Sequence, residues 1–77
     1  MHEQLLLRLR NVNGGRVHDI YADMFWEGLQ LRLAVMEHLG LHPMVVELSF
    51  AEDDGPIDDL ETLWELGIQY GSELWMH

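Results

Sequence analysis

Residues 62–74 read T-L-W-E-L-G-I-Q-Y-G-S-E-L, and this stretch is the most informative part of the chain about its fold. We expect a helical turn near residues 60–64, followed by a last strand at residues 72–76. A helical turn that leads into a strand sets the end of the element order, and the segments before it must supply the partners of that strand.

Working back along the chain, residues 44–50 (M-V-V-E-L-S-F) are β-branched and aromatic enough to predict a third strand. Residues 52–56 (E-D-D-G-P) then form an acidic turn. A short fourth strand or an extended piece is expected around Ile57.

A helix is predicted within residues 23–39, where the spacing of apolar residues lengthens. Asp23 can cap its start, and Gly40 stands where a left-handed terminating residue is wanted. Pro43 prevents any continuation. The pattern does not decide whether the helix begins near Asp23 or nearer Glu27.

The first residues predict a β-hairpin. In residues 4–10 (Q-L-L-L-R-L-R), leucines 5, 7 and 9 share one face, while Leu6, Arg8 and Arg10 share the other. Residues 11–15 (N-V-N-G-G) tolerate positive φ angles and supply the turn. Residues 16–22 are the second strand, with an inner set of His18, Ile20 and Ala22.

The element order is therefore hairpin, helix, strand, short strand, strand. We predict an α+β fold in which one helix packs on a mixed sheet of four to five strands. Seventy-seven residues are too few for two cores, so residues 1–77 are expected to form a single domain.

Charge and composition exclude several classes of partner. The chain has 14 acidic and four basic residues, a formal net charge of −10 and no lysine. A field of that sign repels phosphate, so nucleic acid and anionic membranes are not expected as partners. The chain has no cysteine, which excludes disulfides and mildly favours an intracellular location in cytoplasm or nucleus. It has no signal peptide pattern and no apolar run of membrane-spanning length.

No pattern typical of an enzyme is present. His38 and His42 are four residues apart, but Gly40 and Pro43 interrupt the helix that would bring them together. The acidic turn lacks the ligand spacing of a calcium loop. We find no catalytic triad order and no phosphate-binding glycine loop. The sequence thus predicts no enzyme activity, metal, cofactor or small-molecule substrate.

Two blocks resemble the ubiquitin-like (β-grasp) family. The first is Thr62-Leu63-x-x-Leu66-Gly67-Ile68-Gln69-x-x-Ser72-x-Leu74, similar to the family's T-L-x-D-Y-x-I-Q-x-x-S-T-L. The second is Gly40-Leu41-x-Pro43 followed by Leu48-Ser49-Phe50-Ala51, similar to G-I-P-P…L-I-F-A at the same spacing. The resemblance implies a ubiquitin-like fold over nearly the whole chain.

The resemblance also implies one ion pair and three departures from the family. Arg32 stands at a core-side lysine position, whose partner would be Asp59 or Asp58. No Gly-Gly ends these 77 residues, so conjugation is not expected unless the native protein continues further. Without lysine, no side chain can receive ubiquitin. The sheet face that ubiquitin-binding domains usually contact is altered at Glu47, Ser49 and His77.

Two surfaces are candidates for partner binding. In the family register Leu31, Val35 and Leu39 face the core, which leaves Leu29, Leu33 and Met36 as a second apolar stripe; Trp26 extends it if the helix begins early. This stripe is either an interface or is covered by other parts of the chain. On the open sheet face, Trp75 with Leu6 and Arg8 forms the second candidate, including a cation–π contact between Arg8 and Trp75.

The leading hypothesis is a non-conjugated interaction module that binds a protein partner or a second copy of itself. One alternative is a modifier or sulfur-carrier precursor whose Gly-Gly lies beyond residue 77. Another is a structural scaffold or oligomerisation domain.

Overall fold

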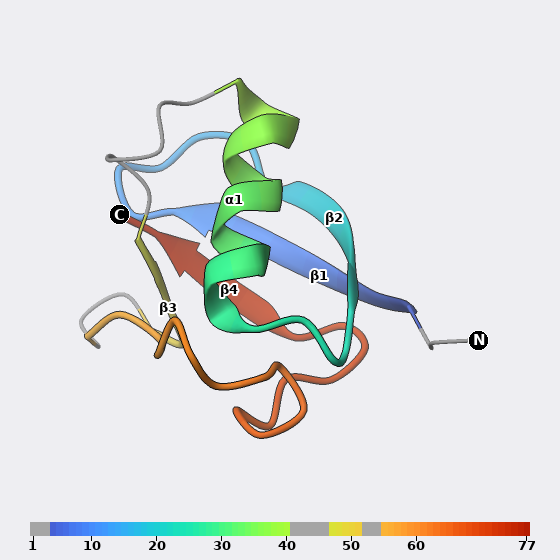
Figure 1. The fold of residues 1–77 in the computed structure, drawn as a ribbon. Coiled ribbons are helices and arrows are strands. Elements are labelled where there is room, and N and C mark those ends of the chain that lie inside the picture. The colour runs from blue at the N-terminus through green and yellow to red at the C-terminus, as the bar shows by residue number, and fades with distance from the viewer. Residues whose placement is uncertain (1–3, 41–46, 52–54) are drawn as a thin grey trace.

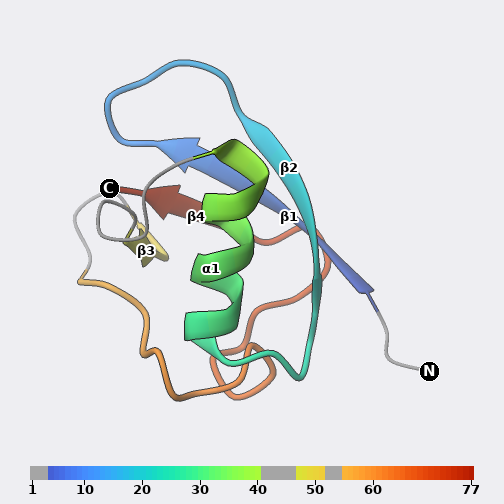
Figure 2. The ribbon, with the colours of Figure 1, turned by 45° about the horizontal axis from the view of Figure 1, so that its top comes forward.

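The computed structural model describes residues 4–40, 47–51 and 55–77, and it places one helix across one face of a mixed sheet (Figure 1). The strands lie in the order β2-β1-β4-β3. Figure 2, turned by 45°, shows that the helix lies on one side of all four strands. The prediction of an α+β fold with one helix on a mixed sheet is confirmed.

The strands pair in both directions. β1 (Gln4–Asn11) pairs antiparallel with β2 (His18–Asp23) and parallel with β4 (Glu73–Met76). The short strand β3 (Leu48–Ser49) pairs antiparallel with β4. β1 and β4 therefore form the centre of the sheet.

The predicted alternation of β1 holds. Leu5, Leu7 and Leu9 are buried, and they stand opposite Ala22, Ile20 and His18 respectively. His18 is only half-buried, because it lies at the hairpin end of the pairing. β2 begins two residues later than expected, because residues 14–17 lie outside the ladder; the turn is closed by a bond from Gly14 N to the carbonyl of Asn11, 2.9 Å long.

Helix α1 (Gly28–Leu39) starts at the later of the two predicted positions. Asp23 instead closes a turn before the helix, where its Oδ1 accepts a hydrogen bond from Phe25 N at 2.8 Å. Glu27 is the N-cap residue, and its backbone N–H donates to Gln30 Oε1. Gly40 ends the helix in the left-handed conformation (φ 67°), as predicted.

The chain after the helix differs from expectation in detail. Of the described residues of the strand predicted at 44–50, Leu48 and Ser49 form β3. Residues 41–46 lie outside the described residues, as do residues 52–54 of the acidic turn. Ile57 donates a hydrogen bond to the carbonyl of Leu48, but it belongs to no strand. The helical turn spans residues 62–67, later than predicted, because Thr62 caps it.

The core lies between the sheet and the inward face of α1. Its members come from every strand, from the helix and from the turn at residues 62–68: Leu5, Leu7, Leu9, Ile20, Ala22, Leu31, Val35, Met36, Leu48, Leu63, Ile68, Leu74 and Met76.

Candidate interaction surfaces

The outward face of α1 carries exposed leucines. Leu29 and Leu33, one helical turn apart, keep 37% and 46% of their surface exposed. Met36, the third member of the predicted stripe, is 5% exposed and belongs to the core, so its predicted position on an exposed stripe is wrong. Leu29 and Met36 lie only about 20° apart around the helix axis. Their difference therefore comes from their position along the axis: Leu29 lies in the first turn of α1, whereas Met36 joins the cluster that includes Leu48 and Met76.

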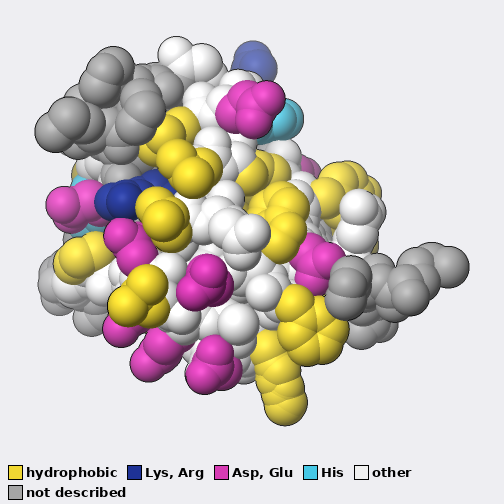
Figure 3. All heavy atoms as spheres, viewed as in Figure 1, with side chains coloured by type: hydrophobic (Ala, Val, Ile, Leu, Met, Phe, Trp, Pro, Cys, Tyr) yellow, Lys and Arg dark blue, Asp and Glu magenta, His cyan; other side chains and the backbone are white. Residues whose placement is uncertain are grey.

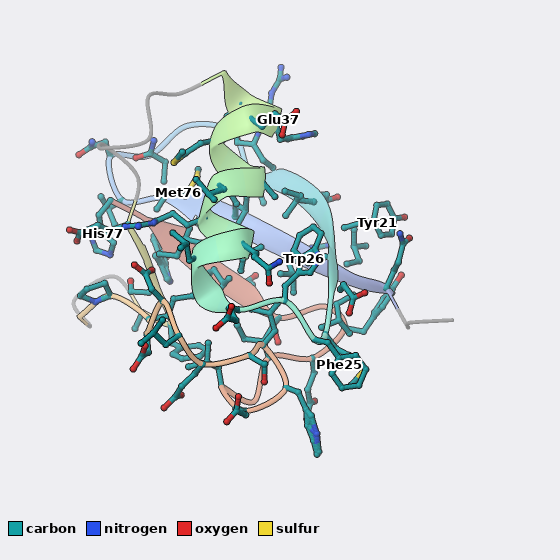
Figure 4. The ribbon with its side chains drawn as sticks, viewed as in Figure 1. Tyr21, Phe25, Trp26, Glu37, Met76 and His77 are labelled. Carbon is teal, nitrogen blue, oxygen red and sulfur yellow. The ribbon has the colours of Figure 1, made fainter. Side chains whose placement is uncertain are left out.

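Trp26 does not extend this surface. The helix begins after it, and its side chain is half-buried against the core (Figure 4). Its backbone is held on both sides, since its N–H donates to the carbonyl of Asp23 and its own carbonyl accepts from Leu63 N. Trp26 thus closes the core below the helix.

The segment at residues 58–61, in which the sequence indicated only a partner for Arg32, is bonded to the start of α1. The amide of Leu29 donates to the carbonyl of Asp59 at 3.0 Å, and that of Gly28 donates to the carbonyl of Glu61 at 2.9 Å. These bonds satisfy donors that a helix start leaves free. They also bring Leu60, which is 77% exposed, beside the first turn of the helix. Leu29, Leu33 and Leu60 are called the helix-side leucines below.

The ion pair expected between Arg32 and Asp59 is present at the same place. Arg32 Nη2 lies 3.1 Å from Asp59 Oδ2, and the two side chains are 31% and 43% exposed. Because both side chains contact water, such a pair is worth at most about 1 kcal/mol. Both residues line a small hollow of about 180 Å³ with Gly28, Glu47, Leu48, Pro56 and Ile57. Arg32 Nε is buried there without a hydrogen-bond partner.

Acidic side chains surround the helix-side leucines. Glu27 and Glu37 lie near the two ends of α1. Asp58 and Glu61 come directly before and after Asp59 and Leu60 in the chain. All four acidic side chains are exposed. Figure 3 views the molecule from this side and shows acidic side chains interspersed with hydrophobic ones. Ion pairs within residues 4–40, 47–51 and 55–77 join only Arg10 to Glu73 and Arg32 to Asp59. The helix side therefore carries uncompensated negative charge.

The open face of the sheet has balanced charge. By strand alternation it presents Leu6, Arg8 and Arg10 of β1 with Glu73 and Trp75 of β4. Arg10 lies directly opposite Trp75 in the register, and Arg8 lies opposite Glu73. The register thus places Arg10 directly opposite the tryptophan and Arg8 one pair away, and the contact between Arg8 and Trp75 stays a prediction. Leu6 and Trp75 are half-buried, whereas Arg8 is exposed.

The three altered positions of the usual contact face are Glu47, Ser49 and His77, and hydrogen bonds connect them to one another. Ser49 is fully buried; its hydroxyl donates to the carbonyl of Ala51 at 2.7 Å and lies 2.7 Å from His77 Nε2. Since the single hydroxyl proton is given to Ala51, Ser49 Oγ accepts from the imidazole. Glu47 and His77 exchange backbone hydrogen bonds of 2.9 and 3.4 Å. These residues are engaged in internal bonds at the end of the sheet.

A third surface, not foreseen from the sequence, lies where β1 starts and the helical turn ends. Two hollows of about 230 and 280 Å³ share Met24, Ile68 and Gln69. Tyr70 borders the first and Trp64 the second, and these side chains are 66% and 52% exposed. Trp64 donates its backbone N–H to Met24, but its side chain is not buried against the residues before the helix. Among the residues that the structure describes, no charged residue lines either hollow.

Two glutamates have perturbed acidity. Backbone and hydroxyl hydrogen bonds from Thr62 lower the pKa of Glu65 below 4.5. The Arg10 guanidinium, which donates two hydrogen bonds of 3.2 Å, lowers the pKa of Glu73 below 4.5. Both carboxylates are exposed and paired with structural neighbours.

The described part of the chain contains no group of three or more histidine and acidic side chains placed to hold a metal ion. None of its helices is long and apolar enough to cross a membrane.

Comparison with known structures identifies the fold. The ubiquitin of Caldiarchaeum subterraneum superposes with a TM-score of 0.82 over 96% of this chain and 91% of its own length, at 20% sequence identity. The fold is that of ubiquitin. A chain of the crystal structure of the pParkin–pUb–UbcH7 complex matches with a TM-score of 0.80 and 25% identity, over 95% of this chain. The match covers 22% of that longer chain. No family model matches the sequence, and no curated protein matches it.

Proposed function

We propose that this ubiquitin-like domain acts as a non-conjugated interaction module that binds a partner protein through its helix side. The observation that carries the proposal is the exposure of the helix-side leucines, Leu29, Leu33 and Leu60, on α1 and on the segment bonded to its first turn. Apolar side chains gathered on a small domain commonly mark a binding site. The role requires no catalysis, and the absence of cysteine is consistent with an intracellular location.

The open sheet face is a weaker candidate surface. Its tryptophan, Trp75, and its leucine, Leu6, are half-buried, and Arg10 is already paired with Glu73. Arg8 is exposed but stands between the carboxylates of Asp19 and Glu73 in the strand register. Tyr21, which stands opposite Leu6 in the register, is 59% exposed, so apolar contact here would come mainly from one side chain and not from three.

The proposal is tested by comparing the proteins that the domain captures with those captured by variants. Leu33→Gln removes an apolar contact without changing charge or helix propensity greatly. Tyr21→Thr is the matched control, because Tyr21 is 59% exposed on β2, away from the helix-side leucines (Figure 4). We expect that a captured partner, once purified and titrated against the domain, binds the wild type and Tyr21→Thr with equal affinity. It should bind Leu33→Gln at least about tenfold more weakly.

The result that would overturn the proposal is a partner bound equally by the wild type and by a variant with Leu29, Leu33 and Leu60 all replaced by glutamine. Sedimentation distinguishes a second copy as the partner. A closed dimer that Leu33→Gln dissociates would mean that the helix side serves self-association instead.

A further inference from the structure

The distribution of charge around the helix-side leucines limits what can bind there. Glu27, Glu37, Asp58 and Glu61 are exposed around these leucines, and the described residues offer none of them an ion-pair partner. Arg32, the one cation of α1, is paired with Asp59. The surface is therefore a small apolar patch within a negatively charged border.

This border disfavours a second copy of the chain. Two copies meeting through this face would bring like charges together, and each copy carries a formal charge of −10. Like-charged groups facing each other across an interface are strongly unfavourable. Phosphate backbones and anionic lipids are excluded by the same sign of charge.

The shape of the patch disfavours an added strand. Its elements are a helix and the loop at 58–61, in which the carbonyls of Asp59 and Glu61 already accept bonds from the helix amides of Leu29 and Gly28. An extended peptide would find no free sheet edge here. Leu29 and Leu33, spaced by one helical turn, instead match the i, i+4 contacts that two packed helices make.

We propose that the helix side binds an amphipathic helix of a partner protein whose apolar stripe is bordered by lysine or arginine. The inference rests on the proposed function and specifies the chemistry of the partner. Apolar residues of the partner helix contact Leu29, Leu33 and Leu60, while its cations lie against Glu37 at one end and against Asp58 and Glu61 at the other.

A defined peptide tests this proposal. The probe is a fluorescein-labelled amphipathic helix, LKKLLKLLKKLLKL, titrated with the domain and followed by fluorescence anisotropy. The matched peptide has every lysine replaced by glutamate. We expect the lysine peptide to bind and the glutamate peptide to bind at least about a hundredfold more weakly. Because exposed charge pairs are screened, raising salt from about 50 to about 300 mM should weaken binding roughly tenfold.

Two pairs of variants separate local contact from long-range attraction. Glu37→Gln with Glu61→Gln removes two charges from the helix side, and Asp19→Asn with Glu73→Gln removes two from the open sheet face. Both doubles have the same net charge. We expect the first double to weaken binding of the lysine peptide about tenfold and the second about twofold or less. Leu33→Gln, with no change in charge, should weaken it about tenfold.

Three outcomes would overturn the inference: equal losses for the two double variants, no loss for Leu33→Gln, or equal binding of the two peptides. Circular dichroism of every variant establishes that it is folded. If a natural partner binds in a manner that depends on Leu33 but the lysine peptide does not, the inference fails and the proposed function stands. If neither depends on Leu33, both fail.

Discussion

The two outer surfaces of this domain differ in whether their acidic side chains have basic partners. On the open sheet face, strand register sets Arg8 opposite both Asp19 and Glu73, and Arg10 forms an ion pair with Glu73. On the helix side, Glu27, Glu37, Asp58 and Glu61 have no cation to pair with among the described residues. The ion pair of the open sheet face joins diagonal neighbours on β1 and β4, since Trp75 is the residue directly opposite Arg10. Four acidic residues without an ion-pair partner among the described residues therefore stand on the side that also exposes the helix-side leucines.

The largest effect is expected in the core, which lies between the sheet and α1 and therefore beneath both surfaces. Leu31→Ala should lower the free energy of unfolding by about 2–5 kcal/mol, because Leu31 is fully buried. Leu33→Ala, two residues further along the same helix, should change it by about 0.5 kcal/mol or less. Chemical denaturation of the two variants measures the difference. Equal losses would mean that Leu33 is a core residue and not part of an outer surface.

Met36→Ala sharpens the boundary of the helix side. We expect the free energy of unfolding to fall by about 2–3 kcal/mol. This is the lower part of the range for buried large side chains, because the surroundings of a flexible methionine adjust readily to its loss. The same denaturation experiment measures it. A loss as small as that of Leu33→Ala would place Met36 with Leu29 and Leu33, and would restore the three-residue stripe that the sequence predicted.

Gly28→Ala should detach the loop at 58–61 from the helix side. A Cβ at Gly28 would overlap the carbonyl oxygen of Asp58 and lie 3.1 Å from its carbonyl carbon, so backbone has to move. We expect a loss of about 1–3 kcal/mol. Gly55→Ala is the control, because its Cβ meets nothing within 4 Å, and it should be nearly neutral. A neutral Gly28→Ala variant would show that the loop moves away from the helix at little cost.

The smallest predicted effect concerns acid pH on the open sheet face. The pKa of Glu73 is lowered from its ordinary value of 4.5 by Arg10, so the contribution to stability is present above pH 4.5 and is lost as pH falls through the folded-state pKa. In Arg10→Gln, the carboxyl should titrate closer to 4.5, and the stability difference from the wild type should shrink in acid. NMR titration of the Glu73 carboxyl measures the midpoint, with Glu65 as the internal reference, since its pKa is lowered by Thr62. An unchanged midpoint for Glu73 would argue against the pairing.

The fold could be predicted from local patterns in the chain. Alternation in residues 4–10 marks the inner leucines of β1, and Gly40 marks the end of α1. The spaced blocks at residues 40–51 and 62–74 point to the ubiquitin-like arrangement that the structure has. Patterns of this kind are local, because period and turn chemistry depend on neighbouring residues.

The surfaces could be predicted only in part. Periodicity placed Leu29 and Leu33 on the outward face but could not distinguish them from Met36, because helical position alone does not say how far a sheet reaches along the helix. Leu60 was missed as a surface residue. The resemblance placed Asp58 or Asp59 beside Arg32 of the helix, but no periodic pattern indicated which side chain of residues 58–61 is exposed there. The hollows beside Tyr70 and Trp64 likewise form only when residues 4–5, 24 and 64–70 meet.

The sequence by itself determined the elements, their order and the sign of the charge, because each depends on composition or on residues close together in the chain. Residues 62–74, with their capped turn and final strand, are an example. Tertiary structure decided which side chains are exposed together and which charges are paired. Those properties depend on contacts between segments far apart in sequence, such as Arg10 with Glu73. The pair of Arg32 with Asp59 is the exception, because the resemblance to the family implied it.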